Sequence, residues 1–113
     1  MPRESLGLVQ GTVDVLILRA LVRASMHGYA VSQWIRERSG GALAVEDAAL
    51  YQALHRLERK GWVEAEWGVS TNNRRAKFYA ITRAGRRRLT AEADQWRRVS
   101  GVITRLLQLA PVP

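Results

Sequence analysis

The sequence predicts a mainly α-helical fold with one small β-hairpin and a long last helix. Three observations predict it. Apolar residues recur with a helical period before residue 60, alternate with glutamates in residues 63–67, and return to a helical period after Thr82. At 113 residues the chain has the length of one domain, and its 47% hydrophobic content is enough for a core.

A first helix is expected from Val9 to Ala24. Its apolar residues lie on nearly every side, which indicates burial on more than one face. Two explanations are open: a central helix wrapped by its own chain, or a helix at a subunit interface, which we favour. The apolar positions are Val9, Val13, Leu16, Ile17, Ala20 and Leu21 on one side, with Val15, Leu18 and Val22 on the other.

The second helix is expected from His27 or Gly28 to Arg38, and the third from about Glu46 to Lys60. Glycines follow both helices, at 40–41 and at 61, where a residue without a Cβ can adopt the left-handed cap. The residues expected to face inward are Val31, Trp34 and Ile35 in the second helix, and Leu50, Ala53, Leu54 and Leu57 in the third.

A hairpin follows. In "WVEAEW" the residues Val63, Ala65 and Trp67 alternate with two glutamates, which predicts a half-buried strand. "GVSTNN" has turn composition, and "RRAKFYAIT" is expected to return as the second strand.

The last helix is expected to begin after the capping residue Thr82 and to run as far as Leu109. A helix of that length reaches roughly 40 Å, more than this core can cover. Gly101 lies within this helix. Two explanations for it remain: the helix bends there, or another backbone approaches closely. The apolar positions that need another surface are Leu89, Ala93, Trp96, Val99, Ile103, Leu106 and Leu107.

Positive charge is concentrated in one part of the chain. The net charge is +8, and residues 50–98 hold twelve basic and five acidic residues. "STNNRRAKFYAITRAGRRR", residues 70–88, contains seven bases and no acid. Clustered arginine in a domain with a pI near 11.2 is typical of a nucleic-acid binder, although charge alone also fits a solvated face.

Several classes of protein are not expected. Without cysteine the chain has no disulfide, thiolate or Cys-ligated zinc, which fits a reducing cytoplasm. The N-terminal apolar run carries charges and is too short to span a bilayer, so a cytoplasmic protein is expected. His27 and His55 have no ligand spacing around them, and no nucleophile–base pair, paired carboxylates or phosphate loop stands out. We therefore expect neither enzymatic activity nor a bound metal or cofactor.

Three helices followed by a two-stranded ribbon is the order of a winged helix-turn-helix. In that architecture the third helix, here residues 46–60, enters the major groove of DNA. The ribbon, residues 68–77, then lies on the backbone or in the minor groove. A polar outer face is ordinary for any surface helix, but element order, charge and both polar faces agree. The candidate contacts are Gln52, His55, Arg56 and Arg59 on the helix, and Asn72, Asn73, Arg74, Arg75 and Lys77 on the ribbon.

The sequence also resembles the PadR-like family of transcriptional regulators, in its compact form with a short last helix. The resemblance rests on "GTVDVLILRAL", "HGYAV", "ALYQALHRLERKGWVEAEW" and "NNRRAKFYAITRAGRRRL". It implies a homodimeric repressor, with a DNA-binding domain at residues 1–82 and a dimerisation helix at residues 83–110. It adds Tyr29 and Tyr51 to the DNA-facing residues, and the implied dimer contacts are Val13, Leu16, Ile17, Leu89, Ala93, Trp96, Ile103 and Leu107.

The chain departs from the family pattern at the start of the third helix. It has Ala48-Ala49 where many relatives have glycine and then a hydroxyl residue, and Gln52 replaces a proline. Gln52 therefore adds a base-reading side chain that proline lacks.

Two other functions are alternatives to a dimeric repressor that reads an inverted repeat in double-stranded DNA. One is a sensor of small aromatic ligands, with Trp96 stacking on the ligand in the dimer groove. The other is a winged helix that binds RNA or protein.

Overall fold

The computed structural model describes residues 10–109, and of Gln10 only the backbone. Val9, at which the first helix was expected to begin, lies outside the described residues. In the described part four helices and three short strands follow one another: α1 (Gln10–Ala20), β1 (Met26–His27), α2 (Gly28–Arg38), α3 (Asp47–Arg59), β2 (Val63–Val69), β3 (Arg75–Ile81) and α4 (Arg83–Leu107).

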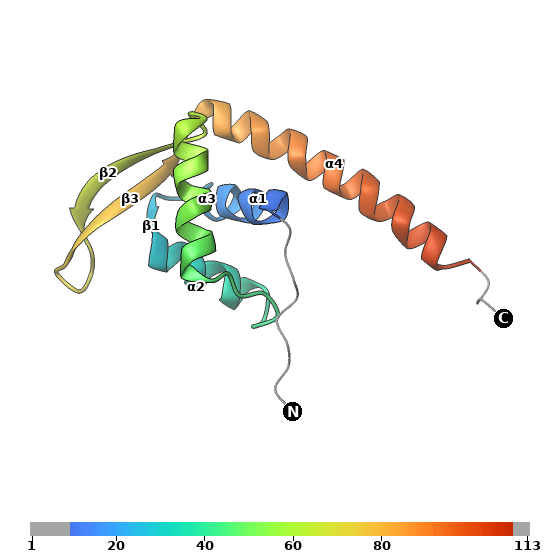
Figure 1. Ribbon diagram of the computed structural model, residues 1–113, viewed down its shortest axis with the longest axis horizontal. Coiled ribbons are helices and arrows are strands. Elements are labelled where there is room, and N and C mark those ends of the chain that lie inside the picture. The colour runs from blue at the N-terminus through green and yellow to red at the C-terminus, as the bar shows by residue number, and fades with distance from the viewer. Residues whose placement is uncertain (1–9, 110–113) are drawn as a thin grey trace.

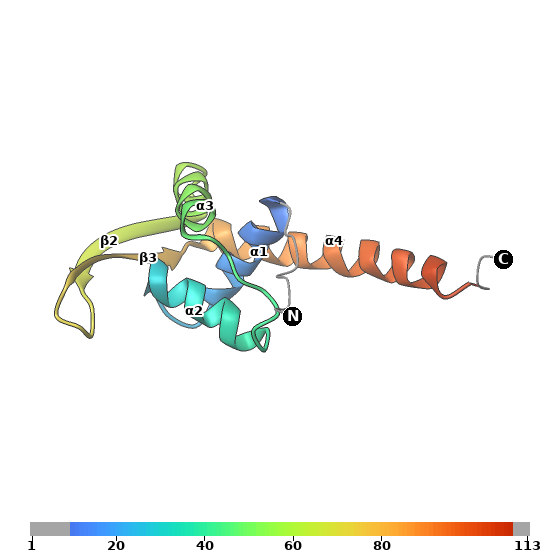
Figure 2. The same cartoon turned by 60° about the horizontal axis from the view of Figure 1, so that its bottom comes forward.

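The elements form a small helical body with two projections. Helices α1, α2 and α3 pack together, the β2–β3 hairpin extends from this body on one side, and α4 runs away on the other (Figure 1). Turning the molecule shows α3 raised above the level of the other elements, so its outer face is open (Figure 2). The predicted fold class, mainly α with a small β part in a winged helix-turn-helix, is confirmed.

The core lies between the first three helices and the base of the hairpin. Its buried residues include all four positions predicted for the inner face of α3, which is why that helix presents a fixed outer face. They are Val13, Ile17, Leu18, Ala20, Leu21, Val31, Ile35, Val45, Leu50, Ala53, Leu54, Leu57, Val63 and Tyr79. Burial of the Tyr79 phenol in this core raises its pKa.

The prediction for the first helix was wrong at its end. Helix α1 stops at Ala20, and the chain turns through residues 21–25 to reach β1. Apolar residues continue past that point because Leu21 is buried from the turn itself, at 2% exposure. Arg86 also donates a hydrogen bond to the Val22 carbonyl oxygen at 3.0 Å, which holds the turn against α4.

Helix α1 is mostly wrapped by its own chain. Val13 and Ile17, predicted as dimer contacts, are buried in the protomer core at 7% and 0% exposure. They therefore offer no surface to a second copy. Leu16 is partly buried and packs against the same core.

The hairpin is confirmed as an antiparallel pair, with Val63 opposite Ile81 and Val69 opposite Arg75. A third strand, β1, pairs with β3 on its other side and was not predicted, because two residues cannot show alternation. Trp67, expected to face inward, is 58% exposed because the hairpin extends beyond the core at that point.

Helix α4 begins as predicted. The Thr82 hydroxyl oxygen accepts a hydrogen bond from the Gly85 amide at 3.0 Å, which caps the helix. The helix then runs without interruption through Gly101 to Leu107. Within the described residues no atom lies within 4 Å of a Cβ placed on Gly101, so no backbone of the same chain explains this glycine.

Candidate nucleic-acid interface

The outer face of α3 carries the polar residues that were predicted there. Gln52, His55 and Arg59 are exposed, and Tyr51 is 43% exposed at the start of the same face. The buried apolar stripe on the opposite side fixes which residues point outward. These side chains can donate and accept hydrogen bonds at base edges or phosphates.

The tip of the hairpin is a tight, polar turn. The Asn73 amide donates to the Ser70 carbonyl oxygen at 2.9 Å, and the Arg74 amide donates to the Ser70 hydroxyl at 3.3 Å. Asn73 has a φ of 59°, a left-handed conformation that asparagine tolerates. The side chains of residues 71–75 are exposed.

On the hairpin shaft the Arg75 guanidinium lies over the Trp67 ring, 4.6 Å from its centroid. Such a cation–π contact restricts the side chain without neutralising it. Arg75 is therefore held in place with its positive charge still available to an anion.

A groove of about 670 Å³ separates the outer face of α3 from the hairpin. Its lining contains three basic residues and no acid among the described residues, and aromatic rings come from four different elements. An elongated anion is the ligand that such a lining favours. The groove is lined by His27, Gly28, Tyr29, Tyr51, His55, Trp67, Ser70, Thr71, Asn72, Arg74, Arg75, Ala76, Lys77 and Tyr79.

Two of the predicted DNA contacts are engaged within the protein. Arg56 Nη2 donates to Asp14 Oδ1 of α1 at 2.6 Å, with both side chains mostly buried. Lys77 Nζ lies 3.3 Å from Glu58 Oε1, which links β3 to α3. Neither acid was predicted as a partner.

Tyr51 is placed by its contact with the start of α2. A Cβ built on Gly28 would lie 2.7 Å from Tyr51 Oη and 2.8 Å from two of its ring carbons. The neighbouring His27 accepts a hydrogen bond from the Ala30 amide at its Nδ1 atom, at 3.2 Å, and so caps α2. Tyr29, on the first turn of that helix, is 67% exposed beside the groove.

Replacing Gly28 by Ala is expected to weaken DNA binding about tenfold, which corresponds to one lost hydrogen bond to a charged group. The added methyl group forces the Tyr51 ring away from α2, while the helical backbone itself accepts alanine. Anisotropy titration of a labelled duplex measures the loss, and Tyr51→Phe shows how much of it comes from the hydroxyl group. If Gly28→Ala binds the duplex with the wild-type affinity, the position of the Tyr51 ring does not contribute to binding.

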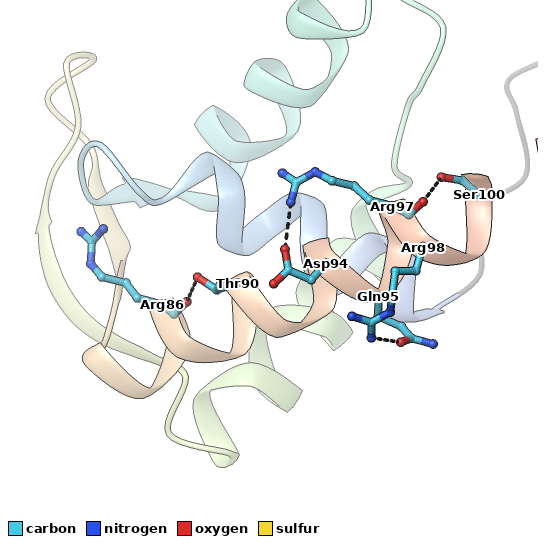
Figure 3. Close-up of polar contacts among 7 residues, drawn as sticks. All are labelled: Arg86, Thr90, Asp94, Gln95, Arg97, Arg98 and Ser100. Carbon is cyan, nitrogen blue, oxygen red and sulfur yellow. Dashed lines mark hydrogen bonds and ion pairs between the residues drawn. The ribbon is translucent and has the colours of Figure 1, made fainter. Parts of the chain in front are cut away.

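The outer part of α4 has an exposed apolar stripe. Trp96, Ile103 and Leu107 are 59%, 49% and 80% exposed, and of the predicted dimer contacts on this helix only Leu89 and Ala93 are partly covered by the protomer. Polar side chains of the same helix pair with each other, such as Arg97 with Asp94 at 3.1 Å and Arg98 with Gln95 at 2.7 Å (Figure 3). Several polar side chains of the helix are thus paired along it, whereas the apolar side is uncovered.

Residues 10–109 hold neither a candidate metal site nor a membrane-spanning helix. Within residues 10–109 no three His, Cys, Asp or Glu side chains come together in a way that could hold a metal ion. No helix in that range has both the length and the apolar character required to cross a membrane.

Comparison with known proteins identifies the family. The model of the transcriptional regulator PadR-like family matches residues 17–91. This chain belongs to the PadR-like family. The resemblance predicted from its motifs is thereby confirmed, and the family is one of DNA-binding transcriptional regulators rather than of enzymes.

Individual proteins of known sequence or structure are similar to this chain over most of its length. An uncharacterised protein of Lysinibacillus sphaericus is 31% identical over 96 residues, which cover 85% of this chain and 88% of the relative. A transcriptional regulator from Clostridium thermocellum has a TM-score of 0.80 and 28% identity, covering 88% of this chain and 96% of its own. A PadR family transcription regulator from Clostridium difficile has a TM-score of 0.74 and 27% identity, covering 84% and 97%.

Proposed function

We propose that this PadR-like regulator is a homodimer that binds an inverted repeat in double-stranded DNA and represses transcription. The observation that carries the proposal is the acid-free groove between the outer face of α3 and the hairpin. Repression is the proposed direction of regulation, because a dimer bound over a promoter would obstruct the polymerase. We assign no catalytic activity to it.

Helix α3 is proposed to enter the major groove. Gln52 and His55 are exposed in its middle, where they can reach base edges, and Arg59 follows one turn later toward a phosphate. The hairpin tip with Arg74 and Arg75 would lie on the adjacent backbone or in the minor groove.

The dimer is proposed to form through the exposed apolar stripe of α4. Large apolar side chains that stay exposed along one side of a helix favour burial against a partner. A two-fold dimer places its two reading helices on half-sites about 34 Å apart, one turn of DNA, or at a multiple of that spacing. Trp96 belongs to this stripe, so stacking on an aromatic effector stays an alternative prediction for the same surface.

The first test is binding to the duplex upstream of the protein's own coding sequence, compared with a scrambled duplex and an A-form RNA of equal length. We expect specific binding that survives near-physiological salt. For each tenfold rise in salt concentration, log K should fall by roughly 0.9 per neutralised phosphate. Equal binding of both DNA duplexes would show that the groove attracts polyanions in general and does not read sequence. Preference for the RNA would favour the alternative function.

Replacing Gln52 by Ala is expected to change sequence preference more than overall affinity. Glutamine can pair bidentately with adenine, and losing one such pair removes about 1–3 kcal/mol of discrimination at one base pair. Binding to a library of single-base operator variants measures the change. Arg74→Gln is the matched control, because loss of a phosphate contact weakens all sequences alike; an equal loss on all sequences for Gln52→Ala would contradict base reading.

A further inference from the structure

Arg56 belongs to the reading helix, yet its charged group points back into the protein. Its Nη2 atom donates to Asp14 Oδ1 at 2.6 Å, and the two side chains are only 20% and 17% exposed. Its Nε atom is buried and has no hydrogen-bond partner among the described residues. The guanidinium is therefore committed to α1, in contrast to the exposed Arg59 on the next turn.

This pair contributes little positive charge to a DNA surface. A guanidinium and a carboxylate at that distance cancel each other's field, and a mostly buried pair is screened little by salt. Counterion release depends on cations that neutralise phosphates, so the exposed arginines of the hairpin tip carry that part of binding.

The pair instead constrains how α3 sits on the body. Helix α1 lies beside α3 and α4 and contacts both (Figures 1 and 2). Asp14 of α1 makes its hydrogen bond to Arg56 of α3. The buried apolar stripe decides which face of α3 points outward, and the ion pair, which depends on direction, narrows the rotation of the helix about its axis further. On the other side of α3, Lys77 and Glu58 link it to β3.

We infer that Asp14 is a positioning residue for DNA recognition: it binds Arg56 and so sets the rotation of α3 that aims Gln52 and His55 at the bases. The inference rests on the proposed DNA-reading function. Asp14 touches no DNA in this arrangement, and Arg56 is a link between helices rather than a phosphate contact.

The experiment compares the wild type with Asp14→Asn, Arg56→Gln and the double variant, on the operator duplex and on a scrambled duplex across a salt series. Each single variant is expected to lower the ratio of specific to non-specific affinity about tenfold, and the double variant no further, because both remove the same interaction. The salt slope of Arg56→Gln is expected to match the wild type. Arg75→Gln is the contrast, with a slope flatter by about 0.9.

Other outcomes would overturn the inference. A flatter slope for Arg56→Gln would show a direct phosphate contact. Unchanged or improved discrimination by Asp14→Asn, or additive losses in the double variant, would show that Asp14 does not position α3. If the wild type itself fails to discriminate, the proposed function fails and the inference with it. The loss of discrimination in each variant is therefore measured relative to a wild type that distinguishes the operator from the scrambled duplex.

A loss of folding is separated from a loss of positioning by two further variants. Asp14→Glu keeps the carboxylate, and Arg56→Lys keeps a cation with fewer donors. Melting curves establish that each protein is folded at the binding temperature. Discrimination retained by Asp14→Glu and reduced by Asp14→Asn at equal melting temperature supports the inference, and equal discrimination in both would contradict it.

Discussion

Replacing Gly85 by Ala is expected to destabilise the protein by about 3 kcal/mol, at the upper end for overpacking of a close-packed site. A Cβ at this position would lie 2.0 Å from the Trp62 carbonyl oxygen and 2.8 Å from Ile81 Cγ1. The first of these neighbours is backbone, so it cannot move aside as a flexible side chain would.

The junction around Gly85 also holds several hydrogen bonds. The Trp62 carbonyl oxygen accepts from the Thr82 amide at 3.0 Å, and the Thr82 hydroxyl donates to the Gly61 carbonyl oxygen at 2.7 Å. Moving α4 to admit a methyl group stretches these bonds together with the helix cap. The "TRAG" sequence is therefore the joint that fixes the direction in which α4 leaves the body.

Thermal unfolding followed by circular dichroism measures this effect. A loss of about 3 kcal/mol lowers the melting temperature of a domain this size by more than about 10 °C. Gly11→Ala in α1 is the matched control, because no described atom lies within 4 Å of its added Cβ and alanine favours a helix. A Gly85→Ala protein that melts within a few degrees of Gly11→Ala would contradict a rigid junction.

The fold was predictable where a pattern extends over many residues. The outer face of α3 follows from one apolar stripe, and the start of α4 follows from Thr82 as a cap. The end of α1 was not predictable, because Leu21 looks like a helical core residue and is buried from a turn. Strand β1 escaped notice because its two residues pair through their backbone alone.

The candidate site was predictable as a surface but not as a network. Spacing placed the exposed side chains of α3 and the hairpin on one side of the molecule. It could not show that Arg56 is paired with Asp14, because the two residues are 42 positions apart and either could have faced water. The same holds for Lys77 and Glu58. Tertiary packing decides which cations remain available to DNA.

Replacing Ile103 and Leu107 together by Glu is expected to convert the proposed dimer into a monomer and to weaken operator binding at least a hundredfold. Both side chains lie on the uncovered apolar stripe of α4, at 49% and 80% exposure, and neither supports the core of its own protomer. Burying a carboxylate in an apolar interface costs several kcal/mol, and two copies of the helix would bring four of them together. A monomer also binds only one half-site. The second half-site adds affinity only when the dimer holds the two reading helices together.

Size-exclusion chromatography with light scattering measures the change in mass, and anisotropy titration measures the loss of affinity. Thr104→Glu is the matched control, because it adds a carboxylate one residue from Ile103 but about 100° around the helix axis, away from the centre of the stripe. The control should stay dimeric and bind the operator. The double variant should keep the melting behaviour of its folded winged-helix body, since that core does not include α4 beyond Leu89. A double variant that remains a dimer of full affinity would exclude the outer part of α4 as the interface.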